Sequence, residues 1–549
     1  MRRWGRWLLE TYLTVDPRSL AAFRVLFGLV LFSDLIRRWL ELRFWYVNSG
    51  LLPNHTLLWR PPAGSMFSLF FTASSEREAQ LGFALCALAY AMFTLGYRTS
   101  WAHAFALVAR VSLNSRLAVL ENGGDMVMNL LCLLTLPLPL GRRFSLDALM
   151  RGSETFRPSA ASGTASRVEA CHETQSPTNA PVVSIAVLAL ILQFSAIYLF
   201  NASSKTGPAW RDGSAVFYAL HQDKLVTWLG VWMREHLSIS MLHFLTRSTL
   251  VTEWLGFALI ISPVFVRETR LLAVCILPPL HLGFALGLNL GGFSPAMMSF
   301  YPLLLRAEHW CWLADHFGAR VRPIAAAFER WLRPWLPARR AVPEPGSSTH
   351  RWLREGAVAV VLVAIASEAL NDNAAVPEAL RFSQPKWAKA VIEYPRILQG
   401  WRMFASEPSR IDSMIYVDAV TAAGVHVDPY NAVASDQHAP TGGVVPTHMG
   451  QSQFFFMYSE RIPYDGYAVY RQAFSEWLIA YPERTGRAED CLLSYDVYLV
   501  TDRSPEPGTQ AAPSPLEHQR FMTYSAPFDS PCRLGAAKKV ANYKPASSG

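Results

Sequence analysis

The chain has 549 residues, of which 51% are hydrophobic, 12% aromatic and only 17% charged. Soluble globular proteins carry about 25% charged residues, and several windows here approach the ~20 consecutive apolar residues that cross a bilayer. This composition excludes a disordered chain, a coiled coil, a collagen and a small disulfide scaffold. The net charge of +8 does not indicate nucleic-acid binding, because the basic residues cluster between apolar segments, where they encode membrane orientation. The sequence therefore predicts a multi-pass membrane protein.

Nine apolar segments predict a mainly α-helical, polytopic bundle of about nine transmembrane spans within residues 1–371. In chain order they cover residues 18–40, 80–97, 101–120, 126–140, 182–201, 248–267, 271–289, 291–306 and 355–371. The first segment opens with no small-residue cleavage motif, so we expect no removable signal peptide.

Arginine-rich loops predict the orientation of this bundle. With alternating spans, the main arginine-rich segments lie on one side; they are residues 2–6, 141–181, 267–270 and 307–354. Two short turns on the other side, 121–125 and 290–293, contain no Lys or Arg. We therefore expect a cytoplasmic N-terminus and an external location for residues 372–549. The loops 152–181 and 336–352 are expected to be mobile, the first because it is rich in Ser, Thr, Ala and Pro.

Residues 307–335 interleave tryptophan with arginine. The tryptophans are Trp310, Trp312, Trp331 and Trp335. This mixture is typical of a helix lying in the headgroup plane of a membrane. A helix packed on the bundle explains the pattern equally well.

Residues 372–549 read as a small α+β domain. The segment 413–430 predicts a β-hairpin turning near residues 422–424, and 491–502 predicts a further strand rich in β-branched and aromatic residues. Between them, 468–483 has helical spacing of its apolar residues. The connection 503–515 and the final residues 544–549 are expected to be flexible.

Two groups among the seven cysteines are informative. Cys86, Cys132 and Cys275 lie inside apolar spans, where a cysteine acts as a small hydrophobic residue, and no spacing indicates a metal site. Cys491 and Cys532 are the two beyond the final span, and an oxidising compartment favours a disulfide between them. Two buried free thiols are the alternative.

Ionisable residues inside the predicted spans are candidates for function, because they are costly in a bilayer unless they are paired. They are Arg24, Asp34, Arg110, Asp125, Glu253 and His281. The alternative for each is a structural partner within the bundle.

Lys205 follows the fifth span, in the segment 201–223. The side chain either extends to the headgroups, with its stem along the lipid, or faces a pocket between helices. In a pocket, loss of solvent favours the neutral amine, which can act as a base.

Several segments together resemble the bacterial HTTM family, which shares its membrane domain with vitamin K-dependent gamma-glutamyl carboxylase. They are VDPRSLAAFRVLFGLVLFSDLIRR (15–38), ENGGDMVMNLLCLLTLPLPLGRRFSLD (121–147), SSKTGPAWRDGSAVFYALHQD (203–223), LPPLHLGFALGLNLGGFSPAMMSFYPLLL (277–305) and GWRMFASEPSRIDSMIYVDAVTAAGVHVDP (400–429). The resemblance covers residues 15–430, and the family suits a bacterial inner membrane with a periplasmic C-terminal domain.

The resemblance implies a carboxylase-like lyase or monooxygenase that uses a reduced, vitamin K-like quinone. Lys205, with Trp210 five residues later, falls on the lysine that deprotonates reduced vitamin K in the carboxylase. His281 falls on a membrane histidine, where neutral imidazole can bond a quinone oxygen; a histidine satisfied in the core is the alternative. We expect Lys205, Trp210, Asp212 and His281 to converge near the outer leaflet, with Glu253 on a facing span. Trp210 and Asp212 are equally compatible with a local turn.

The chain also departs from the carboxylase. Where the carboxylase has Asn-Asn-His, this sequence has Glu121-Asn122-Gly123-Gly124-Asp125, so a histidine of the active region is missing. The alternative function is a non-catalytic membrane protein that binds lipid or quinone and recruits a protein partner through its periplasmic domain. Transport has less support, because the two halves of the chain show no clear interrupted repeats.

Overall fold

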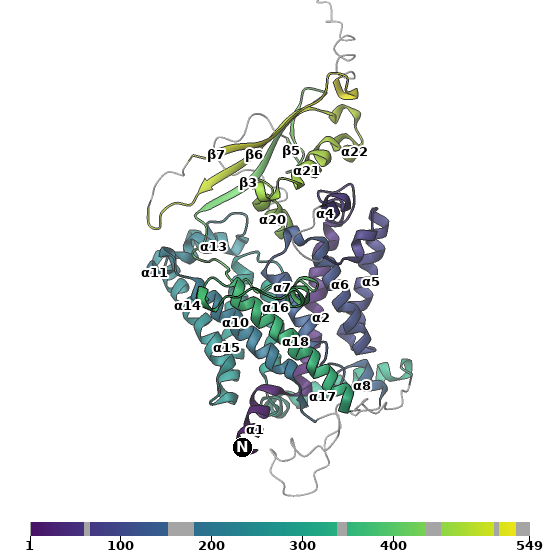
Figure 1. The fold of residues 1–549 in the computed structure, drawn as a ribbon, viewed down its shortest axis with the longest axis vertical. Helices are drawn as coiled ribbons and strands as arrows, with labels where there is room; N and C mark the ends of the chain where they lie inside the picture. The colour runs from purple at the N-terminus through teal and green to yellow at the C-terminus, as the bar shows by residue number, and fades with distance from the viewer. Residues whose placement is uncertain are drawn as a thin grey trace, which may run out of the picture.

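The computed structural model describes residues 2–59, 66–151, 180–337, 348–434, 452–509 and 515–533. Most of the two loops predicted to be mobile, and the final residues 544–549, lie outside these ranges. The described chain forms an elongated helical bundle with a β-sheet at one end (Figure 1).

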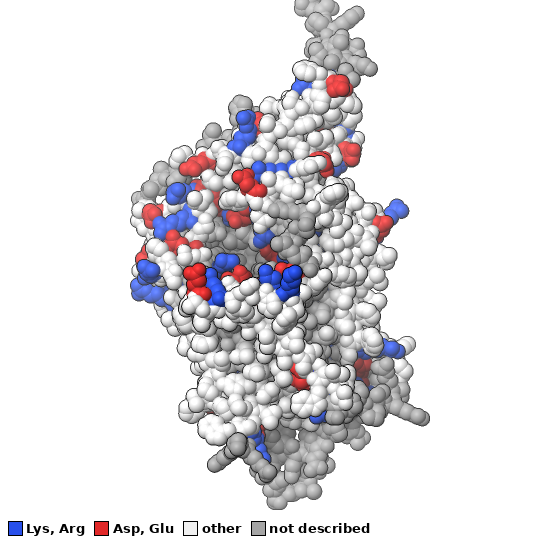
Figure 2. Space-filling model, viewed as in Figure 1, with Lys and Arg blue, Asp and Glu red and all other residues white. Residues whose placement is uncertain are grey.

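Five helices in the described part are long and apolar enough to cross a membrane. They are α2 (Pro17–Leu40), α5 (Glu76–Leu95), α10 (Ile185–Ser204), α14 (Ile239–Ile261) and α15 (Val266–Gly287). At 1.5 Å per residue, helices of this length reach about 30–36 Å, which matches a hydrocarbon core of about 30 Å. Figure 2 shows that charged side chains on this face gather towards the sheet end, above a largely uncharged surface on the bundle. The chain is a membrane protein.

The other four predicted spans are also helical and belong to the same bundle. They are α6 (Thr99–Arg116), α7 (Gly123–Thr135), α16 (Phe293–Phe300) with η4 (Tyr301–Leu304), and α18 (Ser348–Asp372). α6 packs between α5 and α7, α16 packs on α2, α7 and α15, and α18 packs on α10. With 13 residues in α7 and eight in α16, neither helix spans a bilayer alone. The count of nine spans stays a prediction.

Local sequence sets the ends of these helices. Asp16 caps α2 by accepting a hydrogen bond from the Arg18 amide, with Pro17 in the first helical position. Ser75 begins α5 with a capping box, and Gly96 ends it in the left-handed conformation at φ +71°.

Shorter elements lie at both ends of the bundle. The sheet end carries α3 (Leu42–Trp45), α4 (Asn54–Trp59), η2 (Leu69–Thr72), η3 (Ala118–Leu120), α11 (Pro208–Asp212), α12 (Ala215–Leu220), α13 (Trp228–His236), η6 (Glu378–Leu380) and α19 (Lys386–Glu393). The other end carries α1 (Arg2–Leu8), η1 (Leu9–Leu13), α8 (Leu146–Met150), α17 (Ala307–Leu332), η5 (Arg333–Trp335) and the two-stranded sheet of β1 (Thr14–Val15) with β2 (Val182–Val183).

The larger sheet is antiparallel, with five strands in the order β5-β4-β3-β6-β7. Its strands are β3 (Ile411–Thr421), β4 (His426–Asp428), β5 (Val433–Ala434), β6 (Leu492–Arg503) and β7 (Glu517–Ser525). The predicted hairpin is confirmed, because β3 pairs with β4 and Gly424 turns the chain at φ +76°. The strand predicted at 491–502 is β6.

Helices cover one face of this sheet and join it to the bundle. They are α20 (Gln453–Arg461), α21 (Tyr470–Ile479), α22 (Tyr481–Thr485), η7 (Asp465–Tyr467) and η8 (Ala488–Asp490). The helix predicted at 468–483 is α21 with α22, whereas α20 and β7 were not anticipated. In α20, the rings of Phe455 and Tyr458 pack on Trp45 of the bundle, with centroids 4.8 and 5.5 Å away. Arg461 donates hydrogen bonds to the carbonyl oxygens of Val119 and Glu121.

A disulfide links the start of β6 to the chain after β7. Cys491 and Cys532 are bonded, with their Cα atoms 5.5 Å apart. The loop that they close contains all of β6 and β7.

Candidate functional site

Lys205 and Glu253 form a buried ion pair between two apolar helices. Lys205 follows the last turn of α10, and Glu253 lies in α14. The Lys205 Nζ is 2.6 Å from Glu253 Oε2 and 2.8 Å from Oε1, and the two side chains are only 3% and 7% exposed. The lysine therefore faces the interior of the bundle and not the lipid headgroups.

Trp210 covers this pair. The Lys205 Nζ lies 5.1 Å from the centroid of the Trp210 ring, in the range of a cation–π contact. The Trp210 Nε1 donates a hydrogen bond to the Phe404 carbonyl oxygen at 3.0 Å, and the Met403 amide donates to Asn201 Oδ1 at 2.9 Å. The chain that leads into the sheet therefore closes over the sheet end of the Lys205 site.

Asp212 does not join the Lys205 site. Its Oδ1 accepts hydrogen bonds from the amide and hydroxyl of Ser214 at 2.8 and 2.6 Å, and the residue is exposed. A local turn is the alternative for both Trp210 and Asp212. Asp212 does form such a turn, whereas Trp210 contacts Lys205.

His281 forms a second polar layer, deeper in the bundle. Its Nε2 lies 2.8 Å from the Tyr198 hydroxyl, which also bonds the Tyr301 hydroxyl. Tyr198 precedes Lys205 on α10 by two helical turns, which separates the layers by about 10 Å along the helix. Gly256 of α14 makes room for Tyr198, because a Cβ there would lie 2.9 Å from the tyrosine ring.

One nitrogen of His281 remains without a partner. His281 is 2% exposed, and its Nδ1 has no hydrogen-bond partner within the described residues. The ring packs against Phe293, with centroids 5.6 Å apart. An unpartnered buried polar atom is costly, so this nitrogen is available to a ligand.

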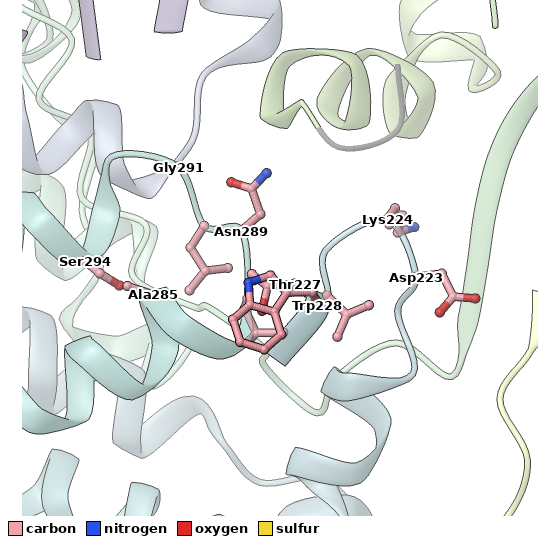
Figure 3. Close-up of a pocket in the computed structure, with 11 residues that line it drawn as sticks. Asp223, Lys224, Thr227, Trp228, Ala285, Asn289, Gly291 and Ser294 are labelled. Carbon is pink, nitrogen blue, oxygen red and sulfur yellow. The ribbon is translucent and has the colours of Figure 1, made fainter. Parts of the chain in front are cut away.

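A cavity of about 330 Å³ opens one helical turn beyond His281, towards the sheet (Figure 3). Its lining includes Asp223, Lys224, Thr227, Trp228, Ala285 and Ser294. Figure 3 shows Asp223 and Lys224 on one side of the cavity and Ala285 with Ser294 on the other. Ser294 is 1% exposed, and its hydroxyl has no partner among the residues that the structure describes. The cavity therefore has a mixed lining, in which polar and apolar side chains are about equally represented.

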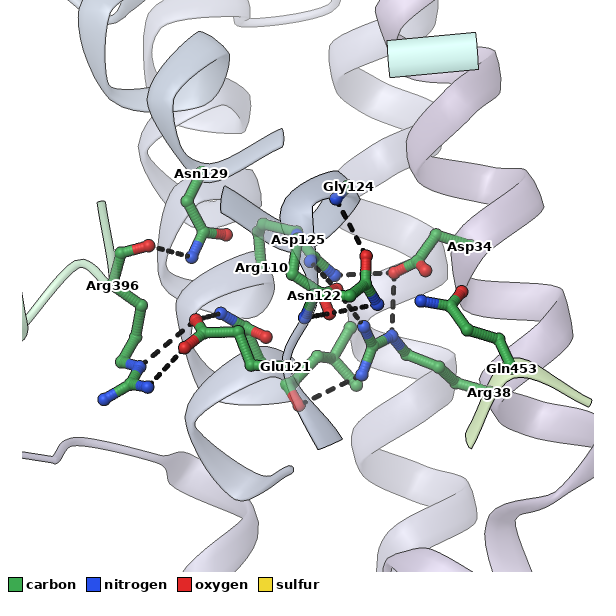
Figure 4. A network of polar contacts seen from close by, with 12 residues as sticks. Asp34, Arg38, Arg110, Glu121, Asn122, Gly124, Asp125, Asn129, Arg396 and Gln453 are labelled. Carbon is green, nitrogen blue, oxygen red and sulfur yellow. Dashed lines mark hydrogen bonds and ion pairs between the residues drawn. The ribbon is translucent and has the colours of Figure 1, made fainter. Parts of the chain in front are cut away.

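Asp125 belongs to a separate network of buried charges (Figure 4). Arg38 of α2 donates to Asp34 at 2.8 Å and to Asp125 at 2.5 Å. Arg110 of α6 donates to Asp34 at 2.6 Å and also bonds Asp125. Two arginines and two aspartates thus neutralise each other and join α2, α6 and α7. The sequence indicated three of these residues but not Arg38, which lies at the end of a predicted span.

The segment 121–125 leads into the start of α7. Asn122 caps this helix, and its side-chain nitrogen Nδ2 donates a hydrogen bond to Asp125 Oδ2 at 2.9 Å. Nearby, Glu121 pairs with Arg396 from the segment that leads into the sheet. Asn122 and Asp125 therefore stabilise the start of α7, and the Glu121–Arg396 pair joins the bundle to the segment before the sheet.

Arg24 lies at the opposite end of the bundle. Its guanidinium donates to the carbonyl oxygens of Leu140 and Thr94 at 2.9 and 3.3 Å, and to that of Phe144. It therefore fastens a loop and does not contribute to the Lys205 site. No cluster of three metal-ligating side chains occurs in the described ranges.

Lys224 is a buried residue that the sequence analysis missed. Its Nζ is 3.2 Å from Asp412 of β3 and also pairs with Glu460 of α20. Burial raises the pKa of Asp412, while the Lys224 ammonium acts in the opposite direction. The scarcity of lysine in this chain is a signal that points to Lys224, which directly follows the segment containing Lys205.

Comparison of the chain with protein-family models, curated proteins and solved structures finds no match.

Proposed function

We propose that this chain is an HTTM-type protein of a bacterial inner membrane, in which Lys205 accepts a proton from a lipid-soluble acid such as a reduced quinone. The observation that carries the proposal is the buried Lys205–Glu253 pair between α10 and α14. Ionisable groups inside a membrane bundle are costly, so a lysine kept there is a functional candidate. The resemblance to the carboxylase supports the same residue.

The pair offers a route to a neutral amine. Ammonium and carboxylate are both disfavoured away from water, and transfer of one proton from Lys205 to Glu253 leaves two uncharged groups. The neutral amine then takes the proton of a substrate hydroxyl. The ammonium that forms remains beside the substrate oxyanion and stabilises it.

The polar groups near the cavity support a quinol-sized substrate. The His281 Nδ1 and the Ser294 hydroxyl are buried and have no partner within the described part of the chain. The Ser294 hydroxyl lines the cavity and can bond an oxygen of a substrate bound there, and the His281 Nδ1 lies about one helical turn from this lining. The exposed tryptophan Trp228 marks the rim of the cavity.

The decisive experiment replaces Lys205 by arginine. Arginine keeps a positive charge for Glu253 but does not lose its proton, so Lys205→Arg is expected to fold and to lose quinol-dependent turnover by at least ~100-fold. Turnover is measured in proteoliposomes supplied with reduced menaquinone or ubiquinone. The control is Lys389→Arg on α19, away from the site. Turnover of Lys205→Arg equal to that of the unaltered protein would show that Lys205 is not the base.

A non-catalytic protein is the second candidate, and one observation favours it. The Lys205 ammonium already has three acceptors, namely both oxygens of Glu253 and the Asn201 carbonyl oxygen at 3.4 Å. A structural pair would have the same contacts. In that case an apolar replacement of both Lys205 and Glu253 leaves function intact, whereas removal of residues 377–549 abolishes binding of a protein partner.

A further inference from the structure

Beyond its first two turns, the helix α17 presents an apolar face that no other part of the described chain covers. With a period of 3.6 residues, one stripe contains Trp310, Leu313, Phe317, Val321, Ile324, Phe328, Trp331 and Trp335, the last of them in η5. Ile324 is 72% exposed and Trp331 is 65% exposed. Within the described ranges, α17 packs mainly against its own continuation η5. An exposed apolar surface of this length indicates a binding surface.

The start of α17 is fixed at the level where α2 begins. Trp310 Nε1 donates to the Ser19 hydroxyl at 2.8 Å, and that hydroxyl donates to the Leu305 carbonyl oxygen at 2.7 Å. Ser19 lies in the first turn of α2, one of the helices apolar enough to span the membrane. Figure 1 shows α17 at the same end of the bundle as α1 and α8, away from the sheet. The helix therefore begins at the boundary between hydrocarbon and headgroups.

The second half of α17 is basic. Residues 320–333 contain four arginines and one glutamate, a net charge of +3. Arg330 and Arg333 lie on the face opposite Ile324 and Phe328, since they are offset by about half a turn of the helix. Long basic side chains beside tryptophans are typical of the membrane interface, where the stems cover apolar surface and the charges meet lipid phosphates.

From these contacts, exposures and charges we propose that α17 lies in the plane of the membrane surface and binds anionic lipid headgroups. The apolar stripe enters the acyl boundary, and the arginines pair with lipid phosphate. A second copy of the chain is not the expected partner, because its own basic α17 would repel this one. This inference does not depend on the role of Lys205.

The test measures hydrogen–deuterium exchange of residues 315–333 in the full chain, with one copy per lipid nanodisc. Basic residues are attracted to an anionic surface, so exchange is expected to be at least ~10-fold slower in discs with phosphatidylglycerol than in pure phosphatidylcholine. Equal exchange in the two lipids would overturn the proposal. Protection that appears only with two copies per disc would assign the surface to a second copy and would also overturn it.

Two matched variants separate insertion of the apolar face from charge. Ile324→Glu and Ala326→Glu both add one negative charge, but they lie on opposite faces of α17. Ile324→Glu is expected to abolish the protection, whereas Ala326→Glu retains most of it. Equal loss in both variants would show that charge alone acts and that the apolar stripe is not inserted.

Discussion

At the scale of single residues, the Lys205–Glu253 pair makes a prediction about stability that is separate from activity. Lys205→Met leaves a buried carboxylate without its partner and is expected to lower the free energy of unfolding by about 3 kcal/mol. The double variant Lys205→Met/Glu253→Leu removes both charges and is expected to recover most of that loss. Unfolding in detergent micelles, analysed as a double-mutant cycle, measures both values. Additive losses in the double variant would contradict a direct pair.

Some residues of the site could be predicted from the sequence, and others could not. Glu253 and His281 stand out because charge and imidazole are rare within apolar spans, and Lys205 stands out because it directly follows one. Which of them meet depends on how α10, α14 and α15 rotate against each other, and periodicity does not give that rotation. Asp212 illustrates the limit, since its carboxylate serves the turn at Ser214. Arg24 donates to backbone carbonyl oxygens of a loop, and no sequence pattern predicts which carbonyls these are.

At the scale of elements, the turn before α16 depends on a glycine that contacts α20. Gly291 has φ +61°, and a Cβ there would lie 1.4 Å from Gln453 Oε1. The same oxygen accepts a hydrogen bond from Arg37 at 3.1 Å. The turn, α20 and α2 therefore meet around one side chain, next to the cavity.

Gly291→Ala is expected to destabilise the protein by about 1–3 kcal/mol, because it strains the turn and displaces Gln453 from Arg37. The matched control is Gly283→Ala within α15, where an added Cβ would meet no atom within 4 Å. That change is expected to stabilise the helix by about 0.5–1 kcal/mol. Thermal unfolding of the two variants in the same detergent compares them. A stable Gly291→Ala variant would mean that α20 does not depend on this contact.

The elements that the sequence indicated least are those that join the two parts of the molecule. The hairpin of β3 and β4 and the strand β6 have alternating or β-branched sequences and were predicted. α20 has aromatic residues at adjacent positions, Phe454, Phe455 and Phe456, so its helical period is masked. β7 contains Glu517, His518, Gln519 and Arg520, because an edge strand with exposed faces needs little apolar sequence. The strand β7 therefore forms through its pairing with β6, which its own sequence does not indicate.

At the scale of the whole molecule, the two ends of the bundle differ in what they carry. α1, the α14–α15 turn and α17 share one end, where the Tyr12 hydroxyl bonds the Ile261 carbonyl oxygen at 2.8 Å. The sheet lies at the other end (Figure 1). α1 and the sheet therefore lie at opposite ends of the bundle. The Cys491–Cys532 disulfide suits an oxidising compartment on the sheet side.

The orientation of the chain is therefore testable without settling the number of spans. A reporter inserted at about residue 440 is expected to be active outside the cytoplasm. A reporter placed in the turn between α14 and α15, or after residue 337, is expected to be active inside, because basic segments are retained in the cytoplasm. Alkaline phosphatase and a fluorescent protein give opposite signals on the two sides and serve as mutual controls. A cytoplasmic signal at residue 440 would reverse the predicted orientation and place the Lys205 end of the bundle on the cytoplasmic side.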